Sequence, residues 1–215
     1  MSLSVAIRAK RFGDALVLRD LVFQVARGEV LAVRGPSGVG KSTLLRIIAG
    51  LDAGFDGQVR RQGRLAMVFQ EPTLLPWRSA RDNLRLTTGV DATQAEAALA
   101  RVGLSGKGAL YPGQLSLGQQ RRLSLARAYA ARPDILLLDE PFVSLDADLV
   151  EDMLALTESV IAEQRPATVF VTHAQAEAER LATRQMVLSP AADETAPVAD
   201  RGSAHEGSRV GGWAP

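Results

Sequence analysis

The chain has 215 residues, of which 47% are hydrophobic, and its formal net charge at pH 7 is +1. This length suits one domain with a sizeable core, and the balanced charge argues against a nucleic-acid binder, which needs a clustered basic surplus. The absence of cysteine excludes disulfides, thiolate metal sites and thiol catalysis. Because we find no signal-peptide pattern and no apolar run near the ~20 residues of a membrane span, we expect a soluble, cytoplasmic chain.

The first third of the chain alternates between extended and helical patterns. Val5–Ala9 and Leu21–Val25 predict two strands that precede the first helix. The apolar segment Glu29–Arg34 predicts a buried strand, Thr43–Gly50 predicts a helix that ends at a glycine, and Leu65–Phe69 predicts another buried strand.

A glycine-rich segment separates the third of these strands from the helix. Residues 35–42 read GPSGVGKS and fit the phosphate-loop pattern G-x-x-x-x-G-K-[S/T]. In such a loop the backbone N–H groups and the helix N-terminus attract phosphate, the lysine reaches the outer phosphates, and the serine hydroxyl ligates Mg²⁺. We therefore expect a nucleotide site made by Gly35, Pro36, Ser37, Gly38, Val39, Gly40, Lys41, Ser42 and Thr43.

The pattern changes between residues 71 and 132, where helices are expected and strands are few. The candidate helices are Ala80–Thr88, Thr93–Val102 and Leu117–Ala131. Thr93 is expected to cap the second of them, with Glu96 completing a capping box. We interpret this segment as a helical insertion into the domain.

Strands return in the last third of the chain. They are expected at Ile135–Leu138, Thr168–Thr172 and Gln185–Leu188, with a helix over about residues 149–163. Strands that alternate with helices predict an α/β fold with a mostly parallel sheet. Residues 190–215 are rich in alanine, proline, glycine, serine and acidic residues, a composition that predicts a disordered tail.

Two carboxylates follow the apolar run at residues 135–138. In a phosphate-loop protein the first, Asp139, belongs near the Mg²⁺ opposite Ser42, and the second, Glu140, can polarise the attacking water. Buried strands often end in an acidic pair, so the pair indicates a catalytic site only in combination with the glycine loop. His173 follows another strand at its C-terminal end, where ligands bind in open α/β sheets.

The segment LSLGQ, residues 115–119, has two interpretations. It can be a helix start, with Ser116 as N-cap and Gln119 completing a capping box. It can also be a second anion site, because a serine hydroxyl, the Gly118 N–H and a helix N-terminus would point the same way. Since this segment lies in the helical insertion, a second copy of the chain could supply it to the nucleotide.

Taken together, these segments resemble the nucleotide-binding subunit of ATP-binding cassette (ABC) transporters over roughly residues 4–188. The elements come in the family's order: Phe12, the phosphate loop, Gln70, LSLGQ, the aliphatic run with its two carboxylates, Ser144-Leu145-Asp146 and His173. The resemblance implies a P-loop NTPase fold with a mostly parallel core sheet, an N-terminal antiparallel β-region and an inserted helical subdomain. It implies an ATPase domain over residues 1–189, with the helical subdomain at about residues 71–132.

The resemblance also implies roles around a bound ATP. Phe12 would stack on adenine, and Gln70 would sense Mg²⁺ and the attacking water. Asp139 would hold Mg²⁺ mostly through water, Glu140 would act as general base, and His173 would contact the γ-phosphate.

Further implied roles require a homodimer in which two chains enclose two ATP molecules. Ser116, Gly118 and Gln119 would face the ATP bound by the opposite subunit, and Asp146 would cross the interface. The chain departs from the family at Leu117, where a glycine is usual. Leu117 could therefore crowd the interface or reduce turnover.

The segment after Gln70, EPTLLPWRSARDNL, closely resembles the corresponding stretch of importers for nitrate, taurine and aliphatic sulfonates. Leu74–Trp77 is too apolar for a free loop tip and suits docking of a short helix of a membrane permease. The alternative is that Trp77 packs inside the helical subdomain. The resemblance further implies a peripheral position on the inner face of the membrane, and a periplasmic or extracellular solute-binding protein as a partner.

The sequence is also compatible with other functions. A soluble ABC protein without a membrane partner would carry the same motifs, although such relatives tend to have two cassettes or large insertions. A scaffold that binds ATP without hydrolysing it is a third alternative, against which Glu140 argues. An importer of another small solute would look the same, because substrate choice lies in other polypeptides.

Overall fold

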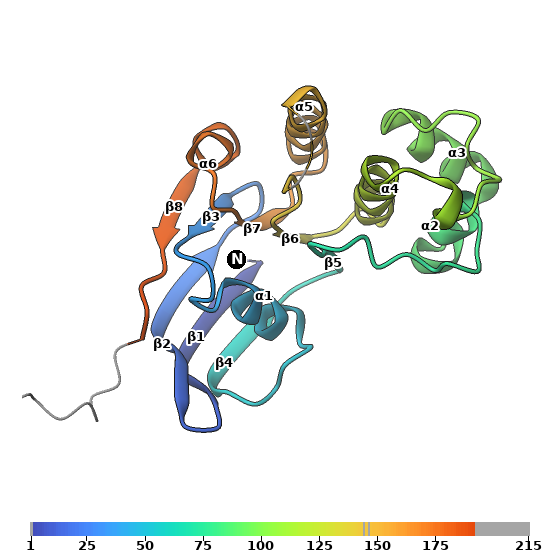
Figure 1. The fold of residues 1–215 in the computed structure, drawn as a ribbon. Coiled ribbons are helices and arrows are strands. Elements are labelled where there is room, and N and C mark those ends of the chain that lie inside the picture. Colours follow the sequence, from blue (N-terminus) through green and yellow to red (C-terminus); the bar gives the residue numbers. More distant parts are fainter. Residues whose placement is uncertain (1, 144, 146, 192–215) are drawn as a thin grey trace, which may run out of the picture.

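The computed structural model describes residues 2–143, 145 and 147–191. Within them the strands form two sheets (Figure 1). A three-stranded antiparallel sheet has the order β2-β1-β4, and a five-stranded parallel sheet has the order β5-β6-β7-β3-β8. The predicted α/β fold, with a parallel core sheet and an N-terminal antiparallel region, is confirmed.

Each strand that the sequence predicts is present, and the first two are longer than expected because they pair with each other as a hairpin from Leu3–Val25 to Phe12–Ala15. The elements in chain order are β1 (Leu3–Phe12), β2 (Ala15–Val25), β3 (Val30–Arg34), α1 (Lys41–Ala49), β4 (Asp56–Arg61), β5 (Leu65–Val68), α2 (Ala80–Thr88), α3 (Ala92–Arg101), the 3₁₀ helix η1 (Pro112–Gln114), α4 (Leu117–Ala130), β6 (Ile135–Asp139), α5 (Ala147–Gln164), β7 (Ala167–Val171), α6 (Gln175–Leu181) and β8 (Arg184–Val187).

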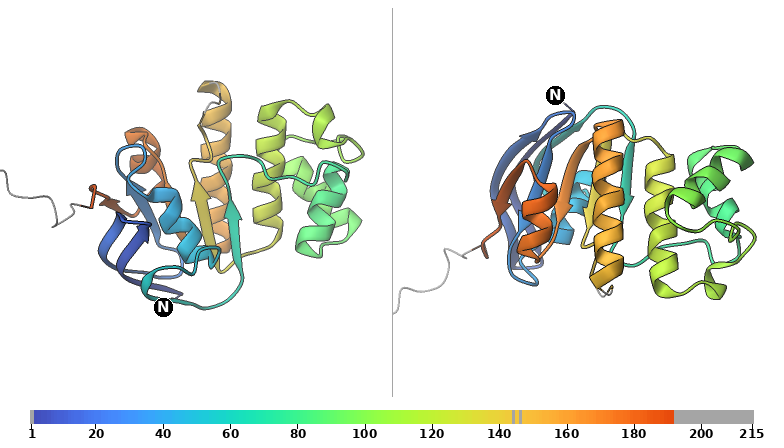
Figure 2. Two further views of the ribbon diagram at one scale, coloured as in Figure 1. Left: turned by 60° about the horizontal axis from the view of Figure 1, so that its bottom comes forward. Right: turned by 90° about the horizontal axis from the view of Figure 1, so that it is seen from above.

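The parallel sheet is covered on both faces. α1 lies between it and the antiparallel sheet, whereas α5 and α6 cover the opposite face (Figure 1, Figure 2). Strand β6 supplies both layers, since Leu137 packs on the α1 side and Leu136 and Leu138 pack on the α5 side. This two-sided burial explains why the strand is apolar along its whole length and does not alternate with polar residues.

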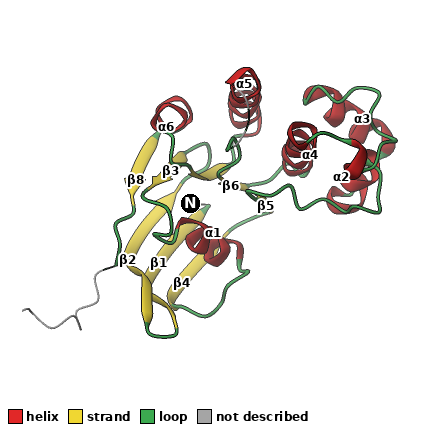
Figure 3. Ribbon diagram, in the orientation of Figure 1, coloured by secondary structure: helices red, strands yellow, loops and turns green. Residues whose placement is uncertain are grey.

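The helices α2, α3 and α4 gather to one side of the sheets, at the right of Figure 3. They have an apolar core of their own, which includes Leu84 of α2, Leu99 of α3 and Leu123 of α4. The ends of this cluster connect to β5 and β6, which are neighbours in the parallel sheet. The helices therefore extend from one side of the sheet and leave its strand order intact.

The start of α3 differs from the one that the sequence predicts. The helix begins at Ala92, and Asp91 is its N-cap, with Asp91 Oδ1 accepting a hydrogen bond from the Gln94 N–H at 2.8 Å. Gln94 Oε1 accepts in return from the Asp91 N–H at 3.0 Å. The predicted cap at Thr93 with Glu96 is wrong, because aspartate caps at least as well as threonine and forms the same box two residues earlier.

The sequence pattern did not reveal α6. This helix has seven residues, of which Ala178 and Leu181 are buried, so it offers too few apolar positions for a helical period to show. Arg180 ties it to α5 by donating hydrogen bonds to the carboxylates of Glu151 and Glu158.

Residues 192–215, which make up most of the predicted tail, lie outside the described residues. In the described part of the chain, no helix combines the length and the apolar character that crossing a bilayer requires.

Gly57 marks a close approach between β4 and β1. Its φ is +146°, and a Cβ there would lie 2.2 Å from Ala6 O and 2.8 Å from Ile7 Cα.

We expect Gly57→Ala to lower the free energy of unfolding by about 2 kcal/mol or more, because the β1 backbone would have to move. Chemical denaturation measures the loss. Gly106→Ala is the control, since Gly106 has a φ of +73° but nothing within 4 Å. It should cost about 1 kcal/mol, and equal losses at the two positions would contradict the steric argument.

Candidate active site

The phosphate loop joins β3 to α1 and leaves the start of the helix open. Gly40 is the N-cap of α1, and no side chain caps the first turn, so N–H groups there are available to an anion. Gly38 and Gly40 have φ values of +78° and +105°. A Cβ at Gly40 would lie within 2.8 Å of side-chain carbons of Leu18 and Val17. Glycine is required there both by the backbone conformation and by the packing against β2.

Lys41 is held inside this loop. Its side chain is buried, and its Nζ donates to Gly35 O at 2.9 Å and to Pro36 O at 3.0 Å. An ammonium group carries three N–H donors. One donor and the positive charge therefore remain for a ligand at the mouth of the loop.

Ser42 and Asp139 bring a hydroxyl and a carboxylate together. Ser42 Oγ donates to Asp139 Oδ1 at 3.0 Å. Asp139 is 4% exposed, and its burial raises the pKa of the carboxyl, an effect that the Ser42 hydrogen bond partly opposes. The pair fits Mg²⁺, which prefers hard oxygen ligands and takes its other ligands from phosphates and water. A cation bound there would offset the cost of burying the Asp139 charge.

Glu140 lies between two basic side chains. Glu140 Oε1 is 3.9 Å from Lys41 Nζ, and Glu140 Oε2 is 3.6 Å from His173 Nδ1. The backbone of Glu140 has a φ of +45°, an unfavourable value for a non-glycine residue. Its N–H donates to Val171 O of β7 at 3.0 Å, which stabilises this turn after β6. Strain of this kind is typical of functional positions, where the surrounding structure imposes the conformation.

Two cavities open over the phosphate loop. One, of about 420 Å³, is lined by loop residues together with Phe12, Gln70 and Glu140. The other, of about 530 Å³, is lined by the first loop residues together with Glu140 and His173. The structure thus gathers residues from the ends of β1, β5, β6 and β7 around the glycine loop. Val17 and Arg34 line these cavities as well, and no motif in the sequence marks either of them.

Ser116, Gly118 and Gln119 lie at the start of α4 and line neither cavity. The Gln119 N–H donates to Ser116 Oγ at 3.3 Å, and the Ser116 N–H donates to Gln119 Oε1 at 3.1 Å. The predicted capping box is confirmed. The Ser116 hydroxyl keeps its own proton for another acceptor, and Leu117 beside it is 51% exposed. Asp146 lies outside the described residues.

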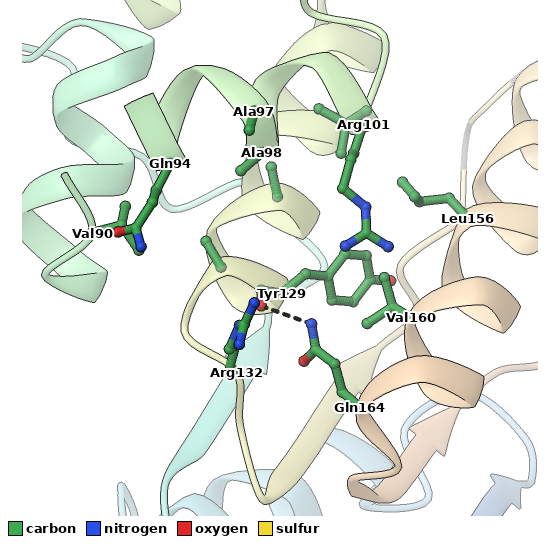
Figure 4. Close-up of a pocket in the computed structure, with 13 residues that line it drawn as sticks. Val90, Gln94, Ala97, Ala98, Arg101, Tyr129, Arg132, Leu156, Val160 and Gln164 are labelled. Atoms are coloured by element: carbon green, nitrogen blue, oxygen red, sulfur yellow. Dashed lines mark hydrogen bonds between the residues drawn. The ribbon is translucent and has the colours of Figure 1, made fainter. Parts of the chain in front are cut away.

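A further cavity, of about 190 Å³, lies away from the glycine loop, among α3, α4 and α5 (Figure 4). Gln164 Nε2 donates to Tyr129 O at 3.2 Å at its edge, and Arg101 Nη2 lies 2.7 Å from Glu163 Oε2. None of the residues that the sequence motifs mark lines this cavity. It is therefore separate from the phosphate-binding region.

Comparison with known proteins agrees with this geometry. The family model for ABC transporters matches residues 18–143. The chain belongs to the ABC transporter family. The chain is an ATPase of that family, and it shares its fold with solved ABC cassettes. The cassette MJ0796, in a dimeric post-hydrolysis state bound to ADP and Pi, is 27% identical with a TM-score of 0.78, over 87% of this chain and 94% of that one.

Two import ATP-binding proteins are more similar to this chain in sequence than the MJ0796 cassette is. An aliphatic sulfonates import ATP-binding protein from Burkholderia cenocepacia is 42% identical over 87% of this chain and 74% of its own length. A protein of the same name from Nocardia farcinica is 47% identical over 82% of this chain and 75% of its own length. The resemblance of this ABC chain to the nitrate, taurine and sulfonate importer group is thereby confirmed.

The raised pKa of Asp139 has a consequence for stability. Because the folded chain holds this proton more tightly than the unfolded chain does, the charged form costs stability, and stability falls as pH rises through the raised pKa. We expect Asp139→Asn without nucleotide to be about 1 kcal/mol more stable than the parent at pH 7, since an amide oxygen can still accept from Ser42. The difference should vanish toward low pH. Denaturation at several pH values measures it, and a less stable variant at pH 7 would contradict the burial argument.

Proposed function

We propose that this chain is the ATP-hydrolysing subunit of an importer for a small anion such as an aliphatic sulfonate, taurine or nitrate. The hydrogen bond from Ser42 to Asp139 beside the glycine loop, with Glu140 next to it, carries the mechanistic part. The names of the relatives from Burkholderia cenocepacia and Nocardia farcinica support the sulfonate class. Residues 1–189 would form the ATPase domain, with residues 71–132 as its helical subdomain.

In this proposal the glycine loop binds the triphosphate. The loop and α1 N–H groups contact its oxygens, and Lys41 places its remaining donor and its charge at the outer phosphates. Phe12, which lies 56% exposed at the edge of the same cavity, stacks on adenine. Ser42 and Asp139 would hold Mg²⁺, which would supply positive charge to offset the charge of the phosphates.

Glu140 is the proposed general base. Its carboxylate borders both cavities, so it can accept a proton from a water placed in line with the γ-phosphate. His173, 3.6 Å from Glu140, contacts the γ-phosphate from the end of β7. Gln70, exposed after β5 in the cavity, orients that water and connects the site to the segment that leads into the helices.

The proposal needs a second copy of the chain. Ser116, Gly118 and Gln119 line neither cavity of their own chain, but the exposed start of α4 offers a hydroxyl and a helix N-terminus to a phosphate. A homodimer in which each chain covers the ATP of the other would complete both sites, with Asp146 at the interface. The dimeric state of the MJ0796 cassette supports this arrangement. Loss of the γ-phosphate would remove the bridging contacts and reopen the dimer.

The proposed permease contact lies between Gln70 and Trp77. Trp77 is 68% exposed, so it does not pack inside the helical subdomain. The loop around it is braced by the buried Asn83, whose side chain accepts from the Leu75 N–H at 2.8 Å and donates to Leu75 O and Arg78 O at 3.1 Å. An exposed tryptophan on a preformed loop is a typical anchor for a partner. The chain would thus be peripheral at the cytoplasmic face, with a solute-binding protein elsewhere in the system.

The assigned base can be tested by Glu140→Gln. We expect this variant to bind ATP and to hydrolyse it at least about a hundredfold more slowly, because the amide cannot accept the proton. It should accumulate as a dimer only when ATP is present. Phosphate release and size-exclusion chromatography with light scattering measure the two effects. Glu163→Gln, which changes an exposed acid of α5, is the control, and wild-type turnover in Glu140→Gln would rule out this base.

The docking loop can be tested by Trp77→Ala. We expect the isolated chain to keep its basal ATPase activity and to lose most of its binding to the permease of its own system, by about tenfold or more. Co-purification from membranes and ATPase assays in proteoliposomes measure the two properties. Leu86→Ala, at a 60% exposed leucine of α2, is the matched control. Equal permease binding by both variants would exclude Trp77 from the contact.

A further inference from the structure

Phe12 has a charged neighbour that no motif marks. Lys10 Nζ lies 4.4 Å from the centroid of the Phe12 ring. The two residues are two positions apart on β1, so their side chains emerge on the same side of the strand. At this distance the negative face of an aromatic ring attracts a cation.

Lys10 is fixed from the other side by the loop after α1. Its Nζ donates to Asp52 Oδ1 at 2.7 Å and to Gly54 O at 2.9 Å. Asp52 Oδ1 also accepts from the Gly54 N–H at 3.0 Å, which closes a small ring of hydrogen bonds. The Lys10 side chain is 5% exposed. The ammonium group is therefore a fixed point and not a mobile surface charge.

This arrangement leaves part of the ring available to a ligand. Phe12 lines the cavity over the phosphate loop, whereas Lys10 does not, so the ammonium approaches the ring from outside the cavity. A half-exposed aromatic side chain loses rotamer freedom when a ligand stacks on it. A contact that fixes the ring in advance reduces this loss and strengthens binding.

We propose that Lys10, anchored by Asp52 and Gly54 O, is a positioning residue that holds the Phe12 ring for stacking on the base of the nucleotide. This inference rests on the proposed role of Phe12. Lys10 should affect only the binding of the nucleotide's adenine, because its ammonium group contacts the Phe12 ring and the loop after α1. The phosphates are contacted by other residues.

The chain offers a matched control two residues earlier. Arg8 lies on the same strand and pairs with Asp56 of β4, with its Nε 2.9 Å from Asp56 Oδ2. Arg8→Met thus removes a basic residue of β1 and an ion pair with a neighbouring segment, but it leaves Phe12 unaffected. Lys10→Met is the test variant. Lys10→Met/Asp52→Asn removes both charges together, so that no carboxylate is left unpaired.

The experiment compares binding of ADP and of inorganic pyrophosphate by calorimetry, using the full chain and the same Mg²⁺ concentration. We expect Lys10→Met and the double variant to bind ADP about three- to tenfold more weakly, the effect of losing one cation–π contact. Pyrophosphate binding should not change. Lys10→Arg should retain ADP binding, and Arg8→Met should bind both ligands as the parent does. Thermal unfolding verifies that each variant is folded.

Two results would overturn the inference. One is unchanged ADP affinity in both Lys10 variants, and the other is an equal loss for ADP and pyrophosphate, which indicates a general defect. Phe12→Ala separates this inference from the proposed function. If Phe12→Ala binds ADP normally, the adenine-stacking role itself is wrong. If Phe12→Ala weakens ADP alone and the Lys10 variants do not, only the role of Lys10 is wrong.

Discussion

Two segments that lie 97 residues apart meet at the hydrogen bond from Ser42 Oγ to Asp139 Oδ1. Ser42 is in the first turn of α1, and Asp139 is the last residue of β6. The contact exists only because α1 packs against the parallel sheet with its N-terminus at the carboxyl ends of the strands. The same packing places the glycine loop, Glu140 and His173 at one edge. The rest of the site follows from this one alignment of helix and sheet.

The charges at this edge are balanced in a way that suits a triphosphate with a divalent cation. Lys41 and Glu140 are close without a direct hydrogen bond, and Asp139 is buried with a raised pKa. In the proposed complex the positive groups would face phosphate, and the negative groups would face the cation or the attacking water. The charged form of Asp139 is therefore costly without ligand, and a bound cation would offset that cost. This is the expected trade of stability for function.

Much of this arrangement could be predicted from the sequence. The phosphate loop, the β6 carboxylates and the Ser116 capping box are local patterns in which spacing along the chain determines geometry. The α6 helix and the Asp91 cap were not predicted, because a short helix has few apolar residues and several side chains can serve as caps. The contact between Lys10 and Phe12 depends on Asp52, which is brought to β1 only by the fold. The left-handed backbone of Glu140 likewise comes from tertiary contacts and not from residue preference.

In the proposed dimer, one chain's glycine loop and a second chain's α4 N-terminus enclose the same nucleotide. The chain has no cysteine, so Asp14→Cys, in the turn after Phe12, and Gly113→Cys, just before Ser116, can be labelled in separate samples with a donor and an acceptor. Gly113 has open space around it, and Asp14 is exposed. In a Glu140→Gln background, mixing the two samples with ATP should give strong energy transfer, and mixing them with ADP should give little. A dimer that forms with ATP but shows no transfer between these positions would contradict the claim.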